Sequence, residues 1–183
     1  MKLVLLDRDG VLNQDRADFV KNPGELVMIP GSAAAVARLN RAGIKVALCT
    51  NQSCVGRGII GPDMLDRIHD SLRDHLAAAG GHLDLLLHAP DAPDAATDRR
   101  KPGPGMLREA LAQFRVAPHD AVMIGDNLVD LQAAVTAGVG RILVRTGKGA
   151  SMQARGLPAE VLPVTVRVDL ADAVDRLLGD PPP

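Results

Sequence analysis

The stretch Lys2-Leu3-Val4-Leu5-Leu6-Asp7-Arg8-Asp9-Gly10 decides the fold of this 183-residue chain. A short apolar run stops abruptly at two carboxylates, which is typical of a strand that is buried on both faces and ends at a polar edge. The same change occurs after residues 44–49, at Thr50, and after residues 121–124, at Gly125-Asp126. We therefore expect a parallel sheet, in which ligands bind at the carboxyl ends of the strands.

Further apolar runs and amphipathic stretches alternate along the chain. We expect strands at 2–6, 44–49, 83–87, 121–124, 142–144 and 164–168, and helices at 32–42, 63–79, 106–114, 128–137 and 170–178. Ser32 is the expected N-cap of the first helix. The stretches 13–24, 89–105 and 146–163 are expected to be irregular. This order predicts one α/β domain over residues 1–179, a Rossmann-like parallel sheet flanked by helices, with a disordered tail at 180–183.

The composition excludes several classes of protein. Apolar residues make up 46% of the chain, which argues against disorder, and no apolar stretch reaches the roughly 20 residues of a membrane span. The formal net charge is -1 and only Phe19 and Phe114 are aromatic, so we expect no nucleic-acid partner. Cys49 and Cys54 make a poor disulfide framework. We expect a cytoplasmic monomer that acts on a small molecule.

Polar side chains follow the predicted strands at one edge of the sheet. Asp7 and Asp9 follow the first strand, Thr50 the second and Asp126 the fourth, and Lys101 precedes a helix. Each group alone is typical of a polar turn or a helix cap, so the argument depends on the set. Carboxylates this close repel one another unless a cation joins them, and all-oxygen ligands suit Mg2+. With a lysine and a hydroxyl beside them, they predict a site for phosphoryl transfer.

These residues resemble the motifs of the haloacid dehalogenase superfamily of phosphatases. The matching stretches are Asp7-Arg8-Asp9-Gly10-Val11-Leu12-Asn13, Thr50-Asn51-Gln52-Ser53, Arg57-Gly58, Arg100-Lys101-Pro102-Gly103-Pro104-Gly105-Met106, and Gly125-Asp126 with Asp130. The sequences of these motifs are similar to those of the subgroup of heptose-bisphosphate and histidinol-phosphate phosphatases. The resemblance extends from the first strand to Thr146-Gly147, which is nearly the whole chain.

The resemblance implies the chemical roles of the acidic residues. Asp7 would be the nucleophile that forms an aspartyl-phosphate. Asp9 would protonate the leaving oxygen and then activate water. Mg2+ would be bound by the Asp7 carboxylate, the backbone carbonyl of Asp9 and Asp126, with Asp130 behind these ligands.

The resemblance also implies which residues hold the substrate. Thr50 and Lys101 would bind the transferring phosphoryl group. The further substrate-binding positions are Asp15, Arg16, Asp18, Asn51, Gln52, Ser53, Arg100 and Asn127. Arg145 and Lys148 follow the fifth predicted strand, on the functional edge; by position alone they are either ordinary surface cations or a source of positive potential for a second phosphate.

The activity that the resemblance implies is a Mg2+-dependent phosphatase that removes the 7-phosphate of D-glycero-D-manno-heptose 1,7-bisphosphate, toward lipopolysaccharide synthesis. A phosphatase for histidinol phosphate or another small phosphomonoester shares every catalytic residue and stays open. The lack of basic excess disfavours a DNA 3'-phosphatase. A phospho-acceptor signalling domain has no acid/base at the position of Asp9. The stretch 13–24 is too short for an inserted domain, so we expect no separate cap domain.

One stretch departs from the pattern of the subgroup. Many members carry a zinc loop that reads Cys-Pro-His-x-Pro and then Cys-x-Cys before the Arg-Lys-Pro. Ala89, Asp91, Thr97 and Arg99 stand at the four ligand positions here, so a structural zinc is not expected. We expect Asp91 to pair with Arg99 in its place. His69 shows no metal-ligand spacing and is expected on the surface or on a helix face.

Overall fold

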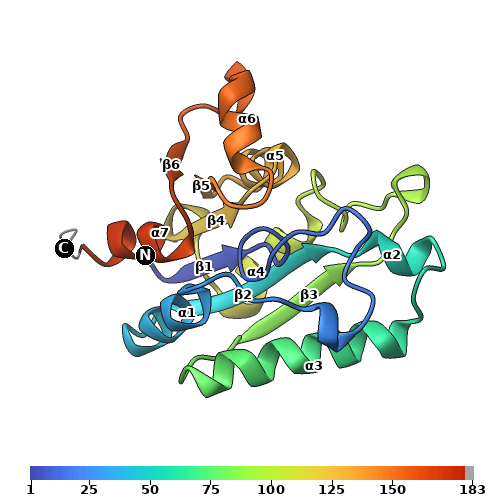
Figure 1. The fold of residues 1–183 in the computed structure, drawn as a ribbon. Helices are drawn as coiled ribbons and strands as arrows, with labels where there is room; N and C mark the ends of the chain where they lie inside the picture. The colour runs from blue at the N-terminus through green and yellow to red at the C-terminus, as the bar shows by residue number, and fades with distance from the viewer. Residues whose placement is uncertain (180–183) are drawn as a thin grey trace.

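The fold is built on one parallel sheet (Figure 1). A computed structural model describes residues 1–179, and the predicted tail at 180–183 lies outside them. The strands are β1 (Leu3–Leu6), β2 (Lys45–Asn51), β3 (Leu85–Ala89), β4 (Ala121–Gly125), β5 (Gly140–Val144) and β6 (Thr165–Arg167), in the spatial order β3-β2-β1-β4-β5-β6. In the register of the sheet, Leu6 is paired with Leu48 on one side and with Ile124 on the other. Strand β1 thus lies inside the sheet, between β2 and β4. Because all the strands are parallel, their carboxyl ends share one edge of the sheet.

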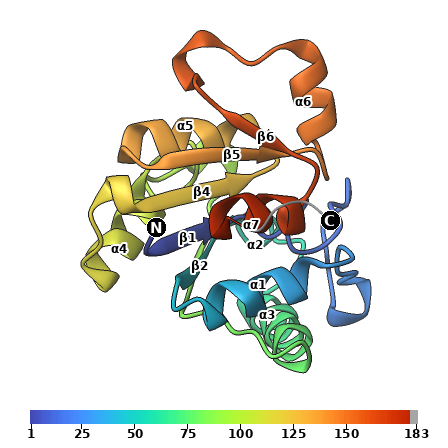
Figure 2. The ribbon, with the colours of Figure 1, turned by 90° about the vertical axis from the view of Figure 1, so that its left-hand side faces the viewer.

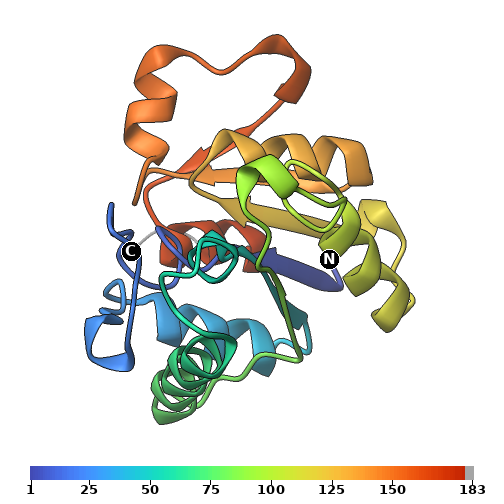
Figure 3. The ribbon, with the colours of Figure 1, turned by 90° about the vertical axis from the view of Figure 1, so that its right-hand side faces the viewer.

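Helices cover both faces of this sheet (Figures 2 and 3). They are α1 (Ser32–Arg41), α2 (Ser53–Gly56), α3 (Pro62–Ala78), α4 (Gly105–Phe114), α5 (Leu128–Ala137), α6 (Gly149–Arg155) and α7 (Leu170–Leu178), with short 3-10 turns η1 (Pro23–Glu25), η2 (Pro93–Ala95), η3 (Pro118–Asp120) and η4 (Ala159–Val161). Val4 and Leu6 pack against α1, α3 and α7, whereas Leu3 and Leu5 face α4 and α5. Successive side chains of a strand point to opposite faces, so β1 is buried on both. Between residues 1 and 179, no helix is both long and apolar enough to cross a bilayer.

The α/β class with one parallel sheet is confirmed. Every predicted strand and helix is present, and its ends differ from the prediction by at most two residues. Helices α5 and α7 begin and end where expected, and a glycine in the left-handed conformation, Gly138 or Gly179, ends each of them. No cap domain is inserted within the described residues.

Two local predictions were wrong. Ser32 is not an N-cap, because Gly31 occupies that position with φ of 83°, and the Ser32 hydroxyl instead donates to the carbonyl oxygen of Leu12 at 2.8 Å. The stretch 146–163 is not wholly irregular, because it contains α6 and η4. Helix α6 has seven residues, of which Met152 alone has a large apolar side chain, so no helical periodicity marks it in the sequence.

Candidate active site

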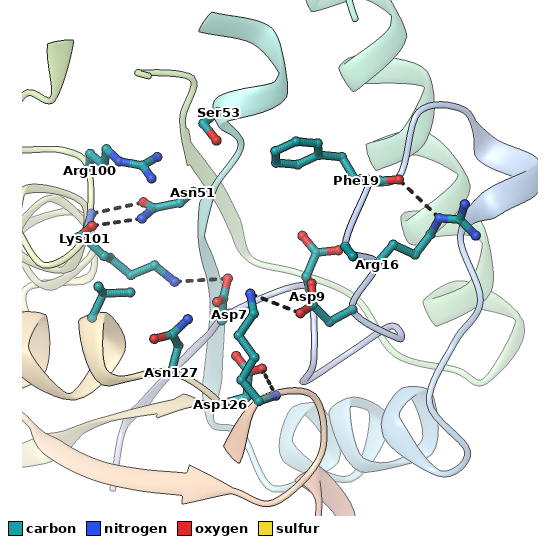
Figure 4. A pocket seen from close by; sticks show the side chains of 14 residues that line it. Asp7, Asp9, Arg16, Phe19, Asn51, Ser53, Arg100, Lys101, Asp126 and Asn127 are labelled. Carbon is teal, nitrogen blue, oxygen red and sulfur yellow. Dashed lines mark hydrogen bonds and ion pairs between the residues drawn. The ribbon is translucent and has the colours of Figure 1, made fainter. Parts of the chain in front are cut away.

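A cavity of about 400 Å3 opens at the carboxyl edge of the sheet (Figure 4). It is lined by Asp7, Asp9, Asp15, Arg16, Ala17, Phe19, Asn51, Ser53, Arg100, Lys101, Asp126, Asn127, Val129 and Lys148. Most of the side chains predicted for the site therefore meet in one place. Thr50, Gln52 and Asp130 are buried behind the cavity wall, and Asp18 lies outside it.

Three carboxylates crowd together, two of them at the floor of the cavity and one directly behind it. Asp7, Asp126 and Asp130 each offer one oxygen within 4.8 Å of the others. Burial, opposed by Lys101 and assisted by Asp130 and Asp9, raises the pKa of Asp7 to about 6. Burial and the charges of Asp7 and Asp130 raise the pKa of Asp126 to about 8. Such mutual repulsion is relieved by a cation, so this set of oxygen donors fits a hard divalent ion.

Lys101 carries a completely buried positive charge into this cluster. Its Nζ lies 3.0 Å from Asp7 Oδ1 and 2.6 Å from Asp130 Oδ1. Burial alone would lower the pKa of Lys101, but the charges of Asp130 and Asp7 outweigh it and raise the pKa, so the group stays an ammonium. Asn51 fixes the lysine backbone, because its Nδ2 donates to the Lys101 carbonyl at 2.9 Å and its Oδ1 accepts from the Lys101 N–H at 3.0 Å.

Asp130 differs from the other two carboxylates in having no access to the cavity. One oxygen pairs with Lys101, and the other accepts a hydrogen bond from the backbone N–H of Asn127 at 3.0 Å. This second bond is part of the capping box that starts α5. Asp130 is therefore used as a buried counter-ion and a helix cap, which leaves Asp7 and Asp126 facing the cavity.

Asp9 is held by three side chains. Arg8 Nη2 donates to both carboxylate oxygens, at 3.1 and 3.0 Å, Asn13 Nδ2 donates at 2.8 Å and Gln52 Nε2 donates at 2.9 Å. Burial raises the pKa of Asp9, but Arg8 and the two amides outweigh it and lower the pKa below its usual value. Arg8 and Asn13 were not predicted as site residues. In the sequence, only their position inside the stretch 7–13 indicates that they lie near Asp9.

Asp126 is surrounded by backbone that only glycine allows. Its Oδ2 accepts from the Lys148 N–H at 2.7 Å. Gly10 and Gly147 have φ of 81° and 56°, and a Cβ would stand 2.3 Å from Asp126 Oδ2 at the first and 2.1 Å at the second. The Thr146 hydroxyl donates to the carbonyl of Gly10 at 2.6 Å and joins the two loops. The loops after β1 and β5 therefore close around this carboxylate.

Three more cationic side chains lie around the opening of the cavity. Arg16, Arg100 and Lys148 line it together with Asp15, whose Oδ2 lies 3.1 Å from Lys148 Nζ. Asp18 does not line the cavity, but it pairs with Arg16 at 3.1 Å and with Lys21. Three cations around one opening suit an anionic ligand with more than one charged group.

Gln52 and Thr50 form a buried contact behind the acidic residues. Gln52 Nε2 lies 2.9 Å from Thr50 Oγ1 as well as from Asp9, and both side chains are at most 2% exposed. The amide of Gln52 thus orients Asp9 instead of lining the cavity.

The stretch 89–105 is ordered differently from the prediction. Asp91 does not pair with Arg99, because its Oδ2 accepts from the backbone N–H of Thr97 at 2.9 Å and from the Thr97 hydroxyl. Arg99 instead pairs with Glu109 on α4. Arg100 reaches back to the carbonyl of Asp91 at 3.0 Å. Asp91 is thus hydrogen-bonded to Thr97 within its own loop, whereas Arg99 forms an ion pair with α4, outside the loop.

Comparison with known proteins identifies the class that this fold and site define. Residues 98–173 match the HAD-hydrolase-like family model. The chain is 44% identical over 182 residues to the D-glycero-beta-D-manno-heptose-1,7-bisphosphate 7-phosphatase of Bordetella bronchiseptica, which covers 98% of this chain and 99% of that protein. The chain therefore belongs to the HAD-like hydrolases, and it is a phosphatase, that is, a phosphoric monoester hydrolase.

Other relatives place the chain more narrowly within that class. The protein of the same name from Pseudomonas aeruginosa is 40% identical over 176 residues, 96% of this chain and 97% of that protein. A crystal structure of the B. bronchiseptica D,D-heptose 1,7-bisphosphate phosphatase, complexed with magnesium and phosphate, superposes with a TM-score of 0.92 at 43% identity over 99% of this chain and 100% of that one. The Burkholderia thailandensis D,D-heptose 1,7-bisphosphate phosphatase superposes with a TM-score of 0.75 at 36% identity over 98% and 100%.

Proposed function

We propose that this chain removes the 7-phosphate of D-glycero-D-manno-heptose 1,7-bisphosphate in a Mg2+-dependent reaction through an aspartyl-phosphate on Asp7. The observation that carries the proposal is the contact of Asp7 with the buried ammonium of Lys101, beside Asp9 and Asp126, at the floor of one cavity. The names of the relatives support the sugar substrate. A volume of about 400 Å3 lies within the usual range for small-molecule sites.

Asp7, Asp126 and the backbone carbonyl of Asp9 are the groups that would hold Mg2+. Their fit rests on the crowding that raises the pKa of Asp126, and the magnesium and phosphate of the B. bronchiseptica crystal structure support the choice of ion. When bound, Mg2+ supplies positive charge that offsets the charge developing on the phosphoryl oxygens. Asp130 would remain paired with Lys101 and would not bind the ion.

The protein side chains divide the reaction into two displacements. The carboxylate of Asp7 attacks phosphorus, the bond from phosphorus to the sugar oxygen breaks, and Asp9 gives a proton to that leaving oxygen. The pKa of Asp9 is lowered in the free protein, so Asp9 takes up this proton when the negatively charged phosphate of the substrate binds beside it, because a like charge favours the protonated form. Water then attacks the same phosphorus, Asp9 accepts a proton from it, and the bond to Asp7 breaks to release inorganic phosphate. Lys101, which lines the cavity, stabilises the phosphoryl group in both steps, and Thr50 acts from behind the wall through its contact with Gln52.

The cations at the mouth would hold the part of the substrate that is not hydrolysed. Arg16, Arg100 and Lys148 line the opening, and Lys148 is already paired with Asp15 at 3.1 Å. A second phosphate on the sugar would compete with Asp15 for Lys148. Ser53, Asn51 and Asn127 also line the cavity and offer neutral donors and acceptors for sugar hydroxyls.

We further propose that the enzyme acts as a cytoplasmic monomer without structural zinc. Cys49 and Cys54 are free, buried thiols, which suits a reducing compartment. One chain supplies every residue around the cavity. The bond between Asp91 and Thr97 spans two of the four positions at which zinc ligands occur in related loops, and Arg99 at a third is paired with Glu109.

The experiment is phosphate release from a panel of phosphomonoesters, with Asp7→Asn as control. The panel contains both anomers of the heptose 1,7-bisphosphate, histidinol phosphate and a 3'-phosphorylated oligonucleotide, each with Mg2+ and with EDTA. We expect selective turnover of a heptose bisphosphate, loss of only the C7 phosphate resonance in 31P NMR, and no turnover by the variant or in EDTA. Faster turnover of histidinol phosphate or of the oligonucleotide would contradict the proposed substrate.

The aspartyl-phosphate is tested separately. Asp9→Asn slows the attack of water, so p-nitrophenyl phosphate, whose leaving group needs no proton, should load Asp7 faster than it is released. Acid quenching and mass spectrometry should find one added phosphoryl group on the peptide that contains Asp7. An unmodified peptide would contradict the covalent intermediate.

A further inference from the structure

Phe19 is the only aromatic side chain in the wall of the cavity. It is half-buried but belongs to none of the apolar core clusters of residues 1–179, whereas the next residue, Val20, is 1% exposed and lies in the core. In Figure 4 the ring of Phe19 points from its loop into the cavity, toward Ser53. The ring is therefore placed against the space that a ligand would occupy, and the core makes no use of it.

The backbone of Phe19 has a conformation that a bulky side chain rarely adopts. Its φ of 65° lies in the left-handed region, and among the described residues Arg115 is the only other non-glycine residue with a positive φ. Arg115 follows the last turn of α4, where a left-handed residue is common, but Phe19 ends no α-helix. Glycine adopts this φ readily, whereas for phenylalanine it costs free energy. A strained residue of this kind in the wall of a cavity points to a functional role for its side chain.

Arg16 holds this strained residue at both of its peptide groups. The N–H of Phe19 donates to the carbonyl oxygen of Arg16 at 3.2 Å, and Arg16 Nε donates to the carbonyl oxygen of Phe19 at 3.2 Å. Arg16 is itself paired with Asp18 at 3.1 Å, and Asp18 with Lys21. These contacts fix the backbone that carries the ring before any ligand binds, so that binding does not have to order it.

The ring differs in chemistry from the polar side chains around it. Lys101 lies beside Asp7 at the floor, and the cations at the opening suit further anionic groups. The ring of Phe19 offers apolar surface, which suits the C–H groups on the face of a sugar. We propose that Phe19 determines substrate specificity, because its ring packs against the carbon skeleton of the substrate and favours esters that have one over phosphate alone. The inference rests on the proposed function for the identity of that skeleton, the sugar of a heptose bisphosphate.

The kinetic test separates the ring from its strained backbone. Phe19→Gly removes the ring and fits the φ of 65°, whereas Phe19→Ala removes the ring and keeps the strain. Both variants should raise KM for the heptose bisphosphate by about tenfold, the size of one aromatic contact, and leave kcat nearly unchanged, because the ring contacts no reacting atom. Phe19→Tyr keeps the ring and should retain the wild-type KM. Inorganic phosphate fills the phosphoryl site alone, so its inhibition constant should stay the same in all three variants.

Val27→Ala is the matched control, because Val27 is an exposed apolar residue between β1 and α1 that does not line the cavity. It should keep the wild-type constants. An unchanged KM in Phe19→Gly would overturn the proposal. A loss of phosphate inhibition in parallel with the rise in KM would also overturn it, because that result indicates a general distortion of the site.

A second measurement does not depend on turnover. The chain contains two phenylalanines, so 4-fluorophenylalanine gives two 19F signals, and Phe114→Leu identifies the one from Phe19. In Asp7→Asn with Mg2+, saturation with the heptose bisphosphate should move the signal of Phe19, and inorganic phosphate should move it much less. A signal that stays in place, or that both ligands move equally, would overturn the inference. If the wild type turns over histidinol phosphate instead, the proposed function fails, and the same titration with that ester decides the role of Phe19 separately.

Discussion

The buried pair of Lys101 and Asp130 allows a quantitative prediction about stability. Both side chains are completely buried, and the two charged atoms lie 2.6 Å apart. Asp130→Asn keeps the shape of the side chain, but its single oxygen can either accept from the Asn127 N–H, which turns the NH2 group toward the ammonium, or face the ammonium and lose that bond. Lys101 then keeps Asp7 as its only anionic partner among the described residues.

The size of the effect follows from two opposing contributions. Coulomb's law gives about 6 kcal/mol for unit charges at this distance with an effective dielectric constant of about 20, which is an upper bound. Against it, the substitution relieves the repulsion by which Asp130 raises the pKa of Asp7 and of Asp126. Removing one partner of a buried pair usually costs about 3–5 kcal/mol, so we expect a loss near the lower end, about 3 kcal/mol.

Urea unfolding followed by far-UV circular dichroism measures this free energy, near neutral pH and in EDTA. A loss of about 3 kcal/mol corresponds to a fall in Tm of about 6–12 °C for a chain of this size. Asp120→Asn is the matched control, because Asp120 pairs with Lys2, whose side chain is 69% exposed, and that variant should unfold like the wild type. A loss below about 1 kcal/mol in Asp130→Asn is the size found for exposed ion pairs. It would refute the argument that the substitution leaves a buried charge on Lys101 without sufficient compensation.

Three further predictions concern separate parts of the molecule. Gly147→Ala places a Cβ 2.1 Å from Asp126 Oδ2 at a positive φ, so Mg2+ affinity measured by calorimetry should fall at least tenfold, and unchanged affinity would contradict the close contact. Because burial depresses the pKa of His69 to about 3 in the folded protein, the unfolded chain binds one more proton below pH 6.5. The free energy of unfolding should therefore fall as the pH drops from 6.5 to 5, by at most about 1.4 kcal/mol per pH unit. Urea titrations of His69→Gln should lack this fall, and an identical dependence of the free energy on pH in both proteins would refute the prediction. Thr97→Val removes the hydroxyl and keeps the N–H that Asp91 accepts, so hydrogen exchange should rise in residues 91–99 alone, whereas equal protection in both proteins would show that the bond does not order the loop.

The proposed catalytic centre could be predicted from sequence because its residues follow strand ends. Asp7, Thr50 and Asp126 stand directly at or after buried apolar runs, and parallel pairing brings the ends of those runs to one edge. Lys101 is 94 positions from Asp7 in sequence, yet its place before α4 brings it to the same edge. The phosphatase class and the fold were therefore accessible from the order and wording of the motifs.

Other assignments depended on side-chain directions that local sequence does not encode. Gln52 was expected to touch substrate, but its amide turns inward to Asp9 and Thr50. Asp18 was expected in the cavity, but Arg16 and Lys21 hold it outside. The pairing of Asp91 with Arg99 failed because Thr97 is closer in the same loop, while Glu109 on α4 attracts the arginine.

The sequence by itself determined the alternation of strands and helices, the parallel sheet and the set of carboxylates and lysine at its edge. These follow from apolar periodicity and from the position of polar residues, which are properties of a few neighbouring residues. Only the tertiary structure decided that Asp130 is a counter-ion for Lys101, that the buried side chain of Arg8 is paired with Asp9 and that His69 is buried. Such contacts join residues from different elements, and burial in a shared interior sets their charge states, so no local pattern contains them.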